Sequence, residues 1–552
     1  MKRTPLLTAV AAAMLFVVSC KNESKTGVLI PKDASVVLHI NSPSLSSKLS
    51  WEEIKSTNWF KEMYQEAKDS LAQKVLTNPE ASGIDTKLPL AFFMKKHGKG
   101  GYGVFEGSVK DAAAFEAFLK NTNKNAVPQK EGDWHFLHTA DKNVVSWNNT
   151  RFAFIVDMPT LGTSGAYTYT DTTDGRFPAD SLKKFATEVL ALEKKNSLGE
   201  DERFASLLKE NGDVHLWMNS EKLYGGMVGG VMSMMKLNSF IEGNVSASTL
   251  NFDEGKITMK SKQYYGKELT DLIKKYKPQT ITADVLNRIP SQNVMGVFAM
   301  NYPAEGWKAF IQTAGFDGML NAFLGKYNYT FDELIAAYKG EMLIAATDFS
   351  LEQQTQTFPG TSYTYTSTKP DVKMLFALSV NNKASFDKLL GIAQNEMNNE
   401  AGKQALSQIS FKVNNDWFAL SNSAETVDRF LAGGNNKAAF ADKISGHPFG
   451  LYLDVQKIMK SSQPAVTEAS SLSALEASMK LWQDVVMTGG ELKDGAMMGE
   501  MVINLIDKKT NSLKQINQYI EQLAALKKAR NADAGDGDVT SLPPAKDTQA
   551  AQ

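Results

Sequence analysis

Alternating apolar and polar positions are the clearest pattern in the chain. In KITMKSKQYY, residues 256 to 265, Ile257 and Met259 alternate with Thr258 and Lys260, which is the period of a half-buried strand. Similar runs recur with hairpin-length connections, and such connections favour antiparallel pairing. The pattern predicts an α+β fold, built as a duplicated module of mostly antiparallel β-sheet with helices packed on one face.

The first half of the chain predicts a definite order of elements. They are a strand at 35–40, helices between 50 and 76, a hairpin from LPLAFFMKK to YGVFEGSV, a helix at 111–120, strands at 134–138, 143–147 and 151–157, a helix at about 180–210, a strand ending at Asn219 and two closing strands. The second half repeats this order from about 281 to 507. LKQINQYIEQLAALKKAR then predicts an amphipathic helix with Leu513, Ile516, Ile520 and Leu523 on one face.

Two internal echoes indicate the duplication. EGSVKDAAAFEAFLK (106–120) matches ALSVNNKASFDKLLG (377–391), and Ser108, Phe115 and Leu119 fall 271 residues before Ser379, Phe386 and Leu390. WNNTRFAFIV (147–156) matches VNNDWFALSN (413–422) at a separation of 266. Four β-rich runs also end at Asn41, Asn219, Asn301 and Asp454, each before a helical stretch, so we predict that these side chains cap helices.

The N-terminus has the features of an export signal. Lys2 and Arg3 precede an apolar stretch over 6–18 that is too short for a comfortable membrane span. Residues 17–20, VVSC, resemble the lipobox of bacterial lipoproteins, and this resemblance implies cleavage before Cys20 and lipidation of its thiol. Cys20 is the only cysteine in 552 residues, so the fold contains no disulfide. Several acyl chains would anchor the protein to a membrane stably.

The segments together predict six regions. They are a lipoprotein signal peptide over 1–19, a lipidated tether over 20–26, α+β repeats over 27–278 and 279–507, an amphipathic helix over 508–530 and a disordered tail over 531–552. The chain carries 60 Lys and Arg against 61 Asp and Glu, so no bulk field attracts nucleic acid, and none is predicted as a partner.

No motif predicts a cofactor, a metal site or a catalytic constellation. Gly98, Gly100 and Gly103 form a G-x-G-x-x-G between two strands, whereas a dinucleotide fingerprint lies between a strand and a helix. His135 and His138 have an odd separation on a strand, so they point to opposite faces. YGGMVGGVMSMM (224–235) suits either a helix pressed on the sheet or an adaptable apolar binding surface.

Two Thr/Tyr segments are the candidate ligand contacts. SGAYTYTDTT (164–173) carries Tyr167 and Tyr169, and GTSYTYTSTKP (360–370) carries Tyr363 and Tyr365. Both lie in long connections, where binding residues are often found, and their rings could stack on sugars. Strand edges are the preferred interpretation. The two segments are 196 residues apart, which does not match the repeat, so they need not be equivalent.

The chain also resembles a known family. The lipobox, IPKDASVVLHINSPSL (30–45), NPEASGID (78–85) and NVMGVFAMN (293–301) resemble an uncharacterised lipoprotein family of Bacteroidetes, the domain of unknown function 4836 family. The resemblance covers nearly the whole mature chain and implies an envelope lipoprotein of unknown role. Its motifs are strand-helix junctions and turns, so it transfers no catalytic residue. Surface export in that group is associated with acidic residues after the cysteine, and CKNES offers only Glu23.

Three functions follow from these observations. The leading hypothesis is a non-catalytic lipoprotein, anchored in the outer membrane through Cys20, that binds an envelope partner or scaffolds an envelope assembly. The second is a glycan-binding accessory lipoprotein that uses the Tyr/Thr segments at the cell surface. The third is an enzyme with a composite acidic site. The sequence leaves the periplasmic or surface face undecided.

Overall fold

The computed structural model describes most of the chain after the predicted signal and tether. The described residues are 30–66, 73, 77–98, 100–123, 126–139, 143–158, 177–224, 241–357, 360, 362–398, 404, 407–434 and 436–535. The tether, Tyr167, Tyr169 and most of YGGMVGGVMSMM fall outside them. So does the end of the predicted tail from residue 536.

The first half of the chain forms ten strands and the helices between them. They are β1 (Val36–Ile40), α2 (Ser42–Lys48), α3 (Trp51–Ser56), α4 (Asn58–Glu66), β2 (Leu90–His97), β3 (Gly100–Ser108), α6 (Ala112–Thr122), β4 (Gln129–Glu131), β5 (Trp134–His138), β6 (Val144–Trp147), β7 (Arg151–Asp157), α7 (Ala179–Leu190), α8 (Glu202–Leu207), β8 (Val214–Asn219), α9 (Ser220–Tyr224), β9 (Val245–Asp253), β10 (Lys256–Tyr264) and α11 (Lys267–Lys275).

The second half forms eight strands. Its elements are α12 (Ala283–Asn287), β11 (Val294–Asn301), α13 (Ala304–Thr313), α14 (Asp317–Gly325), α15 (Phe331–Ala337), β12 (Tyr338–Thr357), β13 (Thr364–Val380), α16 (Lys383–Glu396), β14 (Ser410–Val413), β15 (Trp417–Ser421), α18 (Ala424–Ala432), α19 (Ala441–Ile444), β16 (Phe449–Leu453), α20 (Val455–Ser462), α21 (Ala469–Leu481), β17 (Trp482–Lys493), β18 (Ala496–Leu505) and α22 (Ser512–Gly535).

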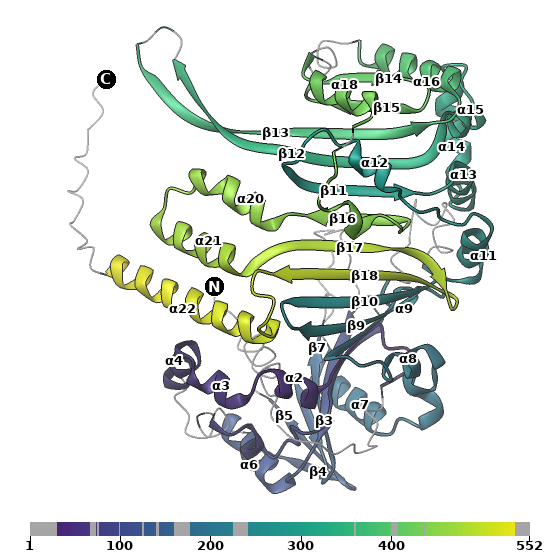
Figure 1. The fold of residues 1–552 in the computed structure, drawn as a ribbon. Coiled ribbons are helices and arrows are strands. Elements are labelled where there is room, and N and C mark those ends of the chain that lie inside the picture. The colour runs from purple at the N-terminus through teal and green to yellow at the C-terminus, as the bar shows by residue number, and fades with distance from the viewer. Residues whose placement is uncertain are drawn as a thin grey trace, which may run out of the picture.

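All 18 strands join one open antiparallel sheet, which runs from β4 at the bottom of Figure 1 to β14 at the top. Their spatial order is β4-β5-β6-β7-β3-β2-β1-β8-β9-β10-β18-β17-β16-β11-β12-β13-β15-β14. Read from each outer edge toward the middle, the two halves repeat the same order. The modules meet where β10 pairs with β18, so the α+β class and the duplication are confirmed.

Strand register reproduces both sequence echoes. Ser108 pairs with Arg151 at the end of β3, and Ser379 pairs with Trp417 at the end of β13. The first pair and the second differ by 271 on one strand and by 266 on the other. The two separations are therefore the offsets of the two strands in one conserved pairing.

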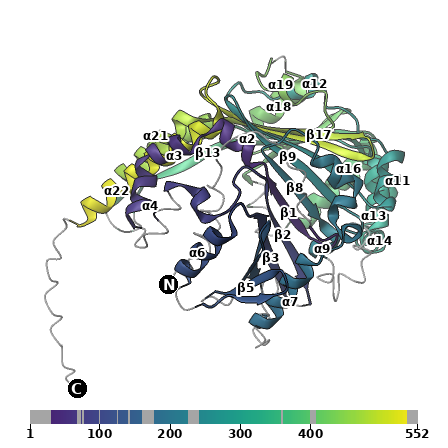
Figure 2. The same cartoon turned by 90° about the horizontal axis from the view of Figure 1, so that it is seen from below.

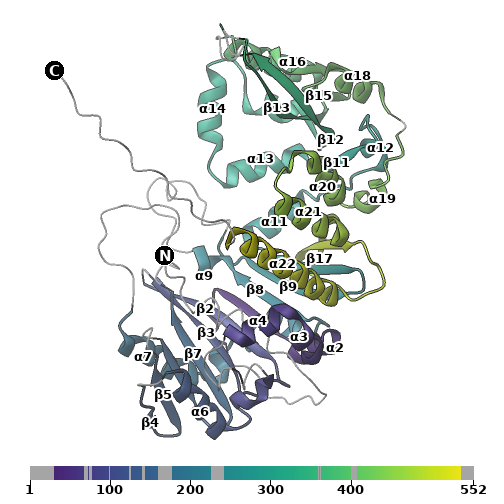
Figure 3. The same cartoon turned by 90° about the vertical axis from the view of Figure 1, so that its left-hand side faces the viewer.

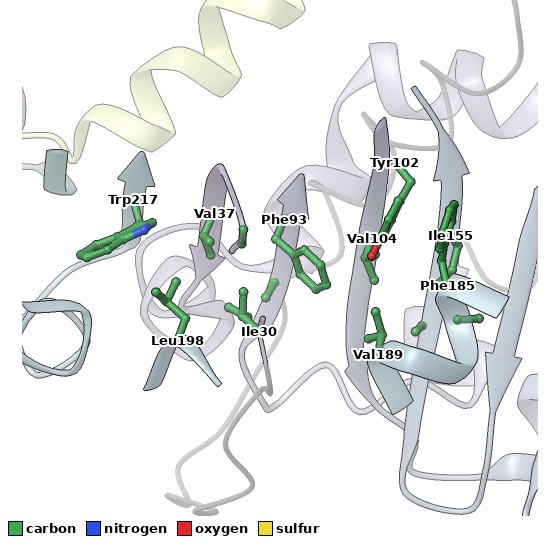
Figure 4. Packing of buried hydrophobic residues seen from close by; sticks show 14 of the residues in the cluster. Ile30, Val37, Phe93, Tyr102, Val104, Ile155, Phe185, Val189, Leu198 and Trp217 are labelled. Carbon is green, nitrogen blue, oxygen red and sulfur yellow. The ribbon is translucent and has the colours of Figure 1, made fainter. Parts of the chain in front are cut away.

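Helices cover both faces of each module rather than the one face that was predicted. Phe185 and Val189 of α7 pack with Val37, Phe93 and Val104 on one face (Figure 4). Phe115 of α6 packs with Trp147 and Phe152 on the other. In the second module, α18 and α16 divide the two faces in the same way. The reason is that these inner strands carry apolar side chains on both faces, as buried strands do.

The last helix of each module crosses to the other module. α11 follows β10 of the first module and packs on α13 of the second. α22 follows β18 of the second module and packs on α4 and β9 of the first, while also contacting α21. Figures 2 and 3 show α22 beside α3, α4 and α21 from two directions. The modules are thus interlocked by an exchange of helices.

Three local predictions need correction. The helix predicted at about 180–210 is broken, because α7 ends at Leu190 and the chain resumes as α8 only at Glu202. Between them, Ser197 forms a bridge with Pro31. The helix predicted to end at residue 530 continues to Gly535. Asn41, Asn219 and Asp454 accept hydrogen bonds from helix N–H groups as predicted.

Asn301 does not cap a helix. Its side-chain amide donates to the carbonyl of Thr280 (3.1 Å), and α13 begins after Pro303 without a side-chain cap. Proline lacks an N–H group and has a fixed φ, so a helix that begins here requires no capping side chain.

Candidate functional site

The β12–β13 hairpin is far longer than the sheet that it belongs to. β12 pairs with β11 only as far as Thr347, and β13 pairs with β15 only from Leu375 onward. Beyond these points the two strands pair only with each other, from Ser350 opposite Asp371 to Thr357 opposite Thr364, among the residues that the structure describes. We call residues 350–371 the ribbon. It projects at the upper left of Figure 1.

The ribbon is an insertion in the second module. In the first module the equivalent hairpin turns at once, with His97 pairing with Gly100. By the register of the two modules, Phe349 and Asp371 occupy the places of His97 and Gly100. Residues 350–370 therefore replace a two-residue turn, although the first module folds the same sheet without them.

The base of the ribbon is held in one direction. Asp348 has a positive φ of 54° at a register shift between Thr347 and Ser350, and a bulge of this kind bends and twists a hairpin. The Asp348 carboxylate accepts from Ser291 Oγ (2.6 Å). On the other strand, the Asn422 side chain donates to the Val372 carbonyl (2.7 Å) and accepts from the Met374 N–H (2.9 Å).

Two of the predicted contact residues lie on this insertion. Tyr363 is 65% exposed directly before β13, and Tyr365 is 39% exposed within it. The Tyr365 hydroxyl donates to Gln356 Oε1 across the ribbon. Tyr167 and Tyr169 lie outside the described residues, in the connection between β7 and α7. The two Thr/Tyr segments therefore occupy different connections and are not equivalent in the repeat.

Buried titratable groups were tested for chemistry first at the His39–His215 pair. The two residues are directly opposite on β1 and β8, and their Nδ1 atoms are 3.3 Å apart. His215 Nε2 lies 3.0 Å from the Glu210 carbonyl, so it carries the proton and His215 Nδ1 accepts from His39. Burial, with His215 as a second cause, lowers the pKa of His39 to about 4. Both rings are thus neutral and fixed.

Glu106 lies on the same register row as this pair, with only Ala91 between it and His39. Burial raises the pKa of Glu106 to about 8, against the opposing effect of Arg151. One carboxyl oxygen has no hydrogen-bond partner, and the other is 3.5 Å from the Arg151 guanidinium. The second module holds apolar residues at the equivalent places, which are Ala377 for Glu106, Ala299 for His39 and Gly450 for His215.

The remaining motifs have structural roles in the described residues. Gly98, Gly100 and Gly103 lie in the β2–β3 hairpin, as predicted. His135 stacks on Trp147 with ring centroids 5.3 Å apart, whereas His138 Nδ1 is buried without a partner. Within the described ranges, no three His, Cys, Asp or Glu side chains are grouped to hold a metal ion. None of the helices described is both long and apolar enough to span a bilayer.

Sequence reasoning found Tyr363 and Tyr365 but missed the ribbon that carries them. The signal was present, because the spacing between LPLAFFMKK and EGSVKD is shorter than that between the matching segments of the second half. Cys20, the predicted lipidation site, falls outside the described residues.

Comparisons with known proteins give a family and no activity. No curated protein matches the chain. Two solved crystal forms of TP0453, forms IV and III, share 12% and 11% identity with it, cover 46% and 47% of this chain and 88% and 90% of their own, and have a TM-score of 0.22. Residues 27–432 match the family described as Domain of unknown function (DUF4836). The chain therefore belongs to the DUF4836 family.

Proposed function

We propose that this protein is a non-catalytic binding or scaffolding lipoprotein of the bacterial cell envelope. In this proposal the signal peptide is removed before Cys20, and the lipidated cysteine anchors the chain in the outer membrane. The resemblance of the chain to lipoproteins of Bacteroidetes supports this placement. The ribbon is the surface that contacts an envelope partner.

The ribbon insertion is the observation that carries the proposal. The sheet of the first module closes the same hairpin with two residues, so the fold does not need residues 350–370. Long insertions on a rigid scaffold are common places for binding residues. The bulge at Asp348 and the Asn422 contacts fix the direction of the insertion, and fixed geometry reduces the entropy lost on binding.

The buried polar groups support a non-catalytic role. His215 and Glu106 are 3% and 2% exposed, so a substrate cannot reach them without opening the core. The His39–His215 hydrogen bond is directed inward along the sheet. A reactive group needs to come within hydrogen-bonding distance of its substrate.

The test replaces residues 350–370 by Gly-Lys, the turn of the sister hairpin, in the full chain in its native cells. Chemical crosslinking followed by purification should recover a specific partner with the wild type and lose it with the replacement. Because the replacement uses a turn that already closes this hairpin, the melting temperature should stay within a few degrees. Equal recovery by both chains, or no specific partner in either, would refute the proposal.

A second candidate function is glycan binding by the ribbon, which the 65% exposure of Tyr363 favours. An exposed aromatic ring can stack on a sugar face. Retention on immobilised amylose, xylan and peptidoglycan should then fall with Tyr363→Ala. Tyr365→Phe is the matched control, because it keeps the ring and removes only the hydroxyl bound to Gln356. Unchanged retention with Tyr363→Ala would remove this candidate.

A further inference from the structure

A cavity of about 300 Å³ lies between α11 and α13, far along the chain from the ribbon residues. Leu269, Leu272 and Ile273 of α11 form one wall. Trp307 and Phe310 of α13 form the opposite wall, and Met300 and Phe449 lie on the strands between them. The lining is almost wholly apolar. This volume is at the lower end of the range for small-molecule sites, roughly 300–1,000 Å³.

Two tyrosine hydroxyls supply the polar groups of the cavity. Tyr265 and Tyr302 both line it, and burial raises the pKa of each hydroxyl. Tyr265 accepts from Thr270 through its carbonyl, and Tyr302 donates to Gly340 through its N–H, while neither hydroxyl bonds to another residue in the described part of the chain. Both phenols remain protonated donors that a ligand oxygen can satisfy.

The position of the Tyr302 ring is built into α13. A Cβ atom at Gly306 would lie 2.6 Å from that ring, so glycine is required for Tyr302 to pack against the first turn of the helix. The ring also makes an edge contact with Trp307, with centroids 5.6 Å apart. The Tyr302 hydroxyl is therefore held at the cavity by its surroundings.

The sister module shows that the fold does not require this cavity. Asn41 and Pro43 are equivalent to Asn301 and Pro303, which places Asp213 where the second module has Pro448. The Asp213 carboxylate is fully buried and accepts from Ser44 Oγ (2.6 Å), Lys48 Nζ (2.7 Å) and the Phe252 N–H (2.6 Å). The first module thus fills with a closed polar network the place that the second leaves open and apolar.

We infer that the cavity binds a single acyl chain, with the Tyr265 and Tyr302 hydroxyls donating to the oxygen atoms of its carboxylate or ester head. The apolar walls match a hydrocarbon chain, and their volume excludes a second one. The two free donors match an acceptor that carries no hydrogen. The seam between the modules is the entrance, because α11 crosses it and Phe310 is 37% exposed at its edge.

Binding is measured on the full chain with Cys20→Ser, so that no anchor acyl chain competes. The probe is the fluorescent fatty acid 11-(dansylamino)undecanoate. We expect saturable one-to-one binding, with energy transfer to the dansyl group because Trp307 lines the cavity. The absence of saturable binding would overturn the inference.

Met300→Trp fills the cavity and should weaken binding at least tenfold, and Met374→Trp is the matched control on the exposed part of β13. If Met300→Trp does not fold, Phe310→Asp at the partly exposed edge replaces it. Loss of binding in the cavity variant alone supports the site. Unchanged binding, or equal loss in the control, places the probe elsewhere and overturns it.

The head group is tested with the double variant Tyr265→Phe and Tyr302→Phe. Its affinity for decanoate should fall about tenfold, as expected for hydrogen bonds to a charged group. An unchanged affinity would overturn the assignment of the hydroxyls. Displacement of the probe by decanoate identifies a free fatty acid, displacement only by phosphatidylethanolamine–phosphatidylglycerol vesicles identifies an esterified membrane chain, and displacement by neither overturns the inference.

Discussion

Lys260 and Glu500 are equivalent residues of the two modules, and they pair directly with each other. Each lies five residues after the glycine turn of its closing hairpin, at Gly255 and Gly495. The pairing of β10 with β18 sets them opposite each other, with Nζ and Oε1 3.9 Å apart. The pseudo-two-fold axis of the duplication passes through this pair, so two identical residues here would face themselves.

Reversing one charge at this axis should weaken the seam between the modules. Lys260→Glu places two carboxylates opposite each other, and like charges on facing strands are unfavourable. Both side chains are well exposed, so we expect a loss of only a few tenths of a kcal/mol in the free energy of unfolding. Urea denaturation at low salt measures it. The charge swap of Lys260→Glu with Glu500→Lys should restore the wild-type value, and failure to restore it would contradict this explanation.

His39 should make the protein less stable in acid. The folded pKa of about 4 is below the ordinary value of 6.5, so between these values the unfolded chain binds a proton that the folded chain excludes. The contribution of His39 is complete above pH 6.5 and is lost as the pH falls toward 4, by roughly 3 kcal/mol at most. His39→Ala, which copies Ala299 of the sister module, should flatten this part of the stability profile. An unchanged slope would contradict the prediction.

Glu106 should act in the opposite direction. Its folded pKa of about 8 is above the ordinary value of 4.5, so the unfolded chain releases its proton first as the pH rises. Stability from this residue is present below pH 4.5 and is lost up to pH 8. Glu106→Gln keeps the shape and removes the titration, so it should be more stable than the wild type at pH 8. Thermal unfolding at pH 5 and pH 8 measures the difference, which should be smaller at pH 5.

The exchanged helix α22 should hold the beginning of α4. The Glu521 carboxylate accepts from the Trp59 N–H (3.0 Å) and from Asn58 Nδ2. Its removal by Glu521→Ala takes away a capping acceptor, which costs about 1 kcal/mol. Hydrogen exchange of the amides in residues 58–66 should become faster. Lys528→Ala, which removes only the exposed ion pair with Glu62, is the control and should leave these amides unchanged.

Much of the fold was predictable because local patterns are repeated. The separations of 271 and 266 identified the duplication, since the strand pairings that produce them are conserved in both modules. Asn148 and Asn414 also make the same turn, each accepting from N–H groups two and three residues later. Such turns depend on neighbouring residues alone and can therefore be read from sequence.

The features that could not be predicted depend on contacts between distant parts. Nothing in KITMKSKQYY indicates that its free edge pairs with β18. The helices α11 and α22 were recognisable as elements, but their periodicity does not say which module they cover. The cavity draws residues from several separate elements. Tyr265 and Tyr302 had no distinguishing sequence signal, because their unpaired hydroxyls become apparent only in three dimensions.

The exchange of closing helices sets the order in which this chain can mature. α4 cannot bury Trp59 against Asn517 until the last part of the chain has been synthesised. The amino-terminal module therefore remains incomplete throughout translation, even though all its strands have already emerged. A chain that completes its core only after release stays open long enough to be threaded through a translocation channel.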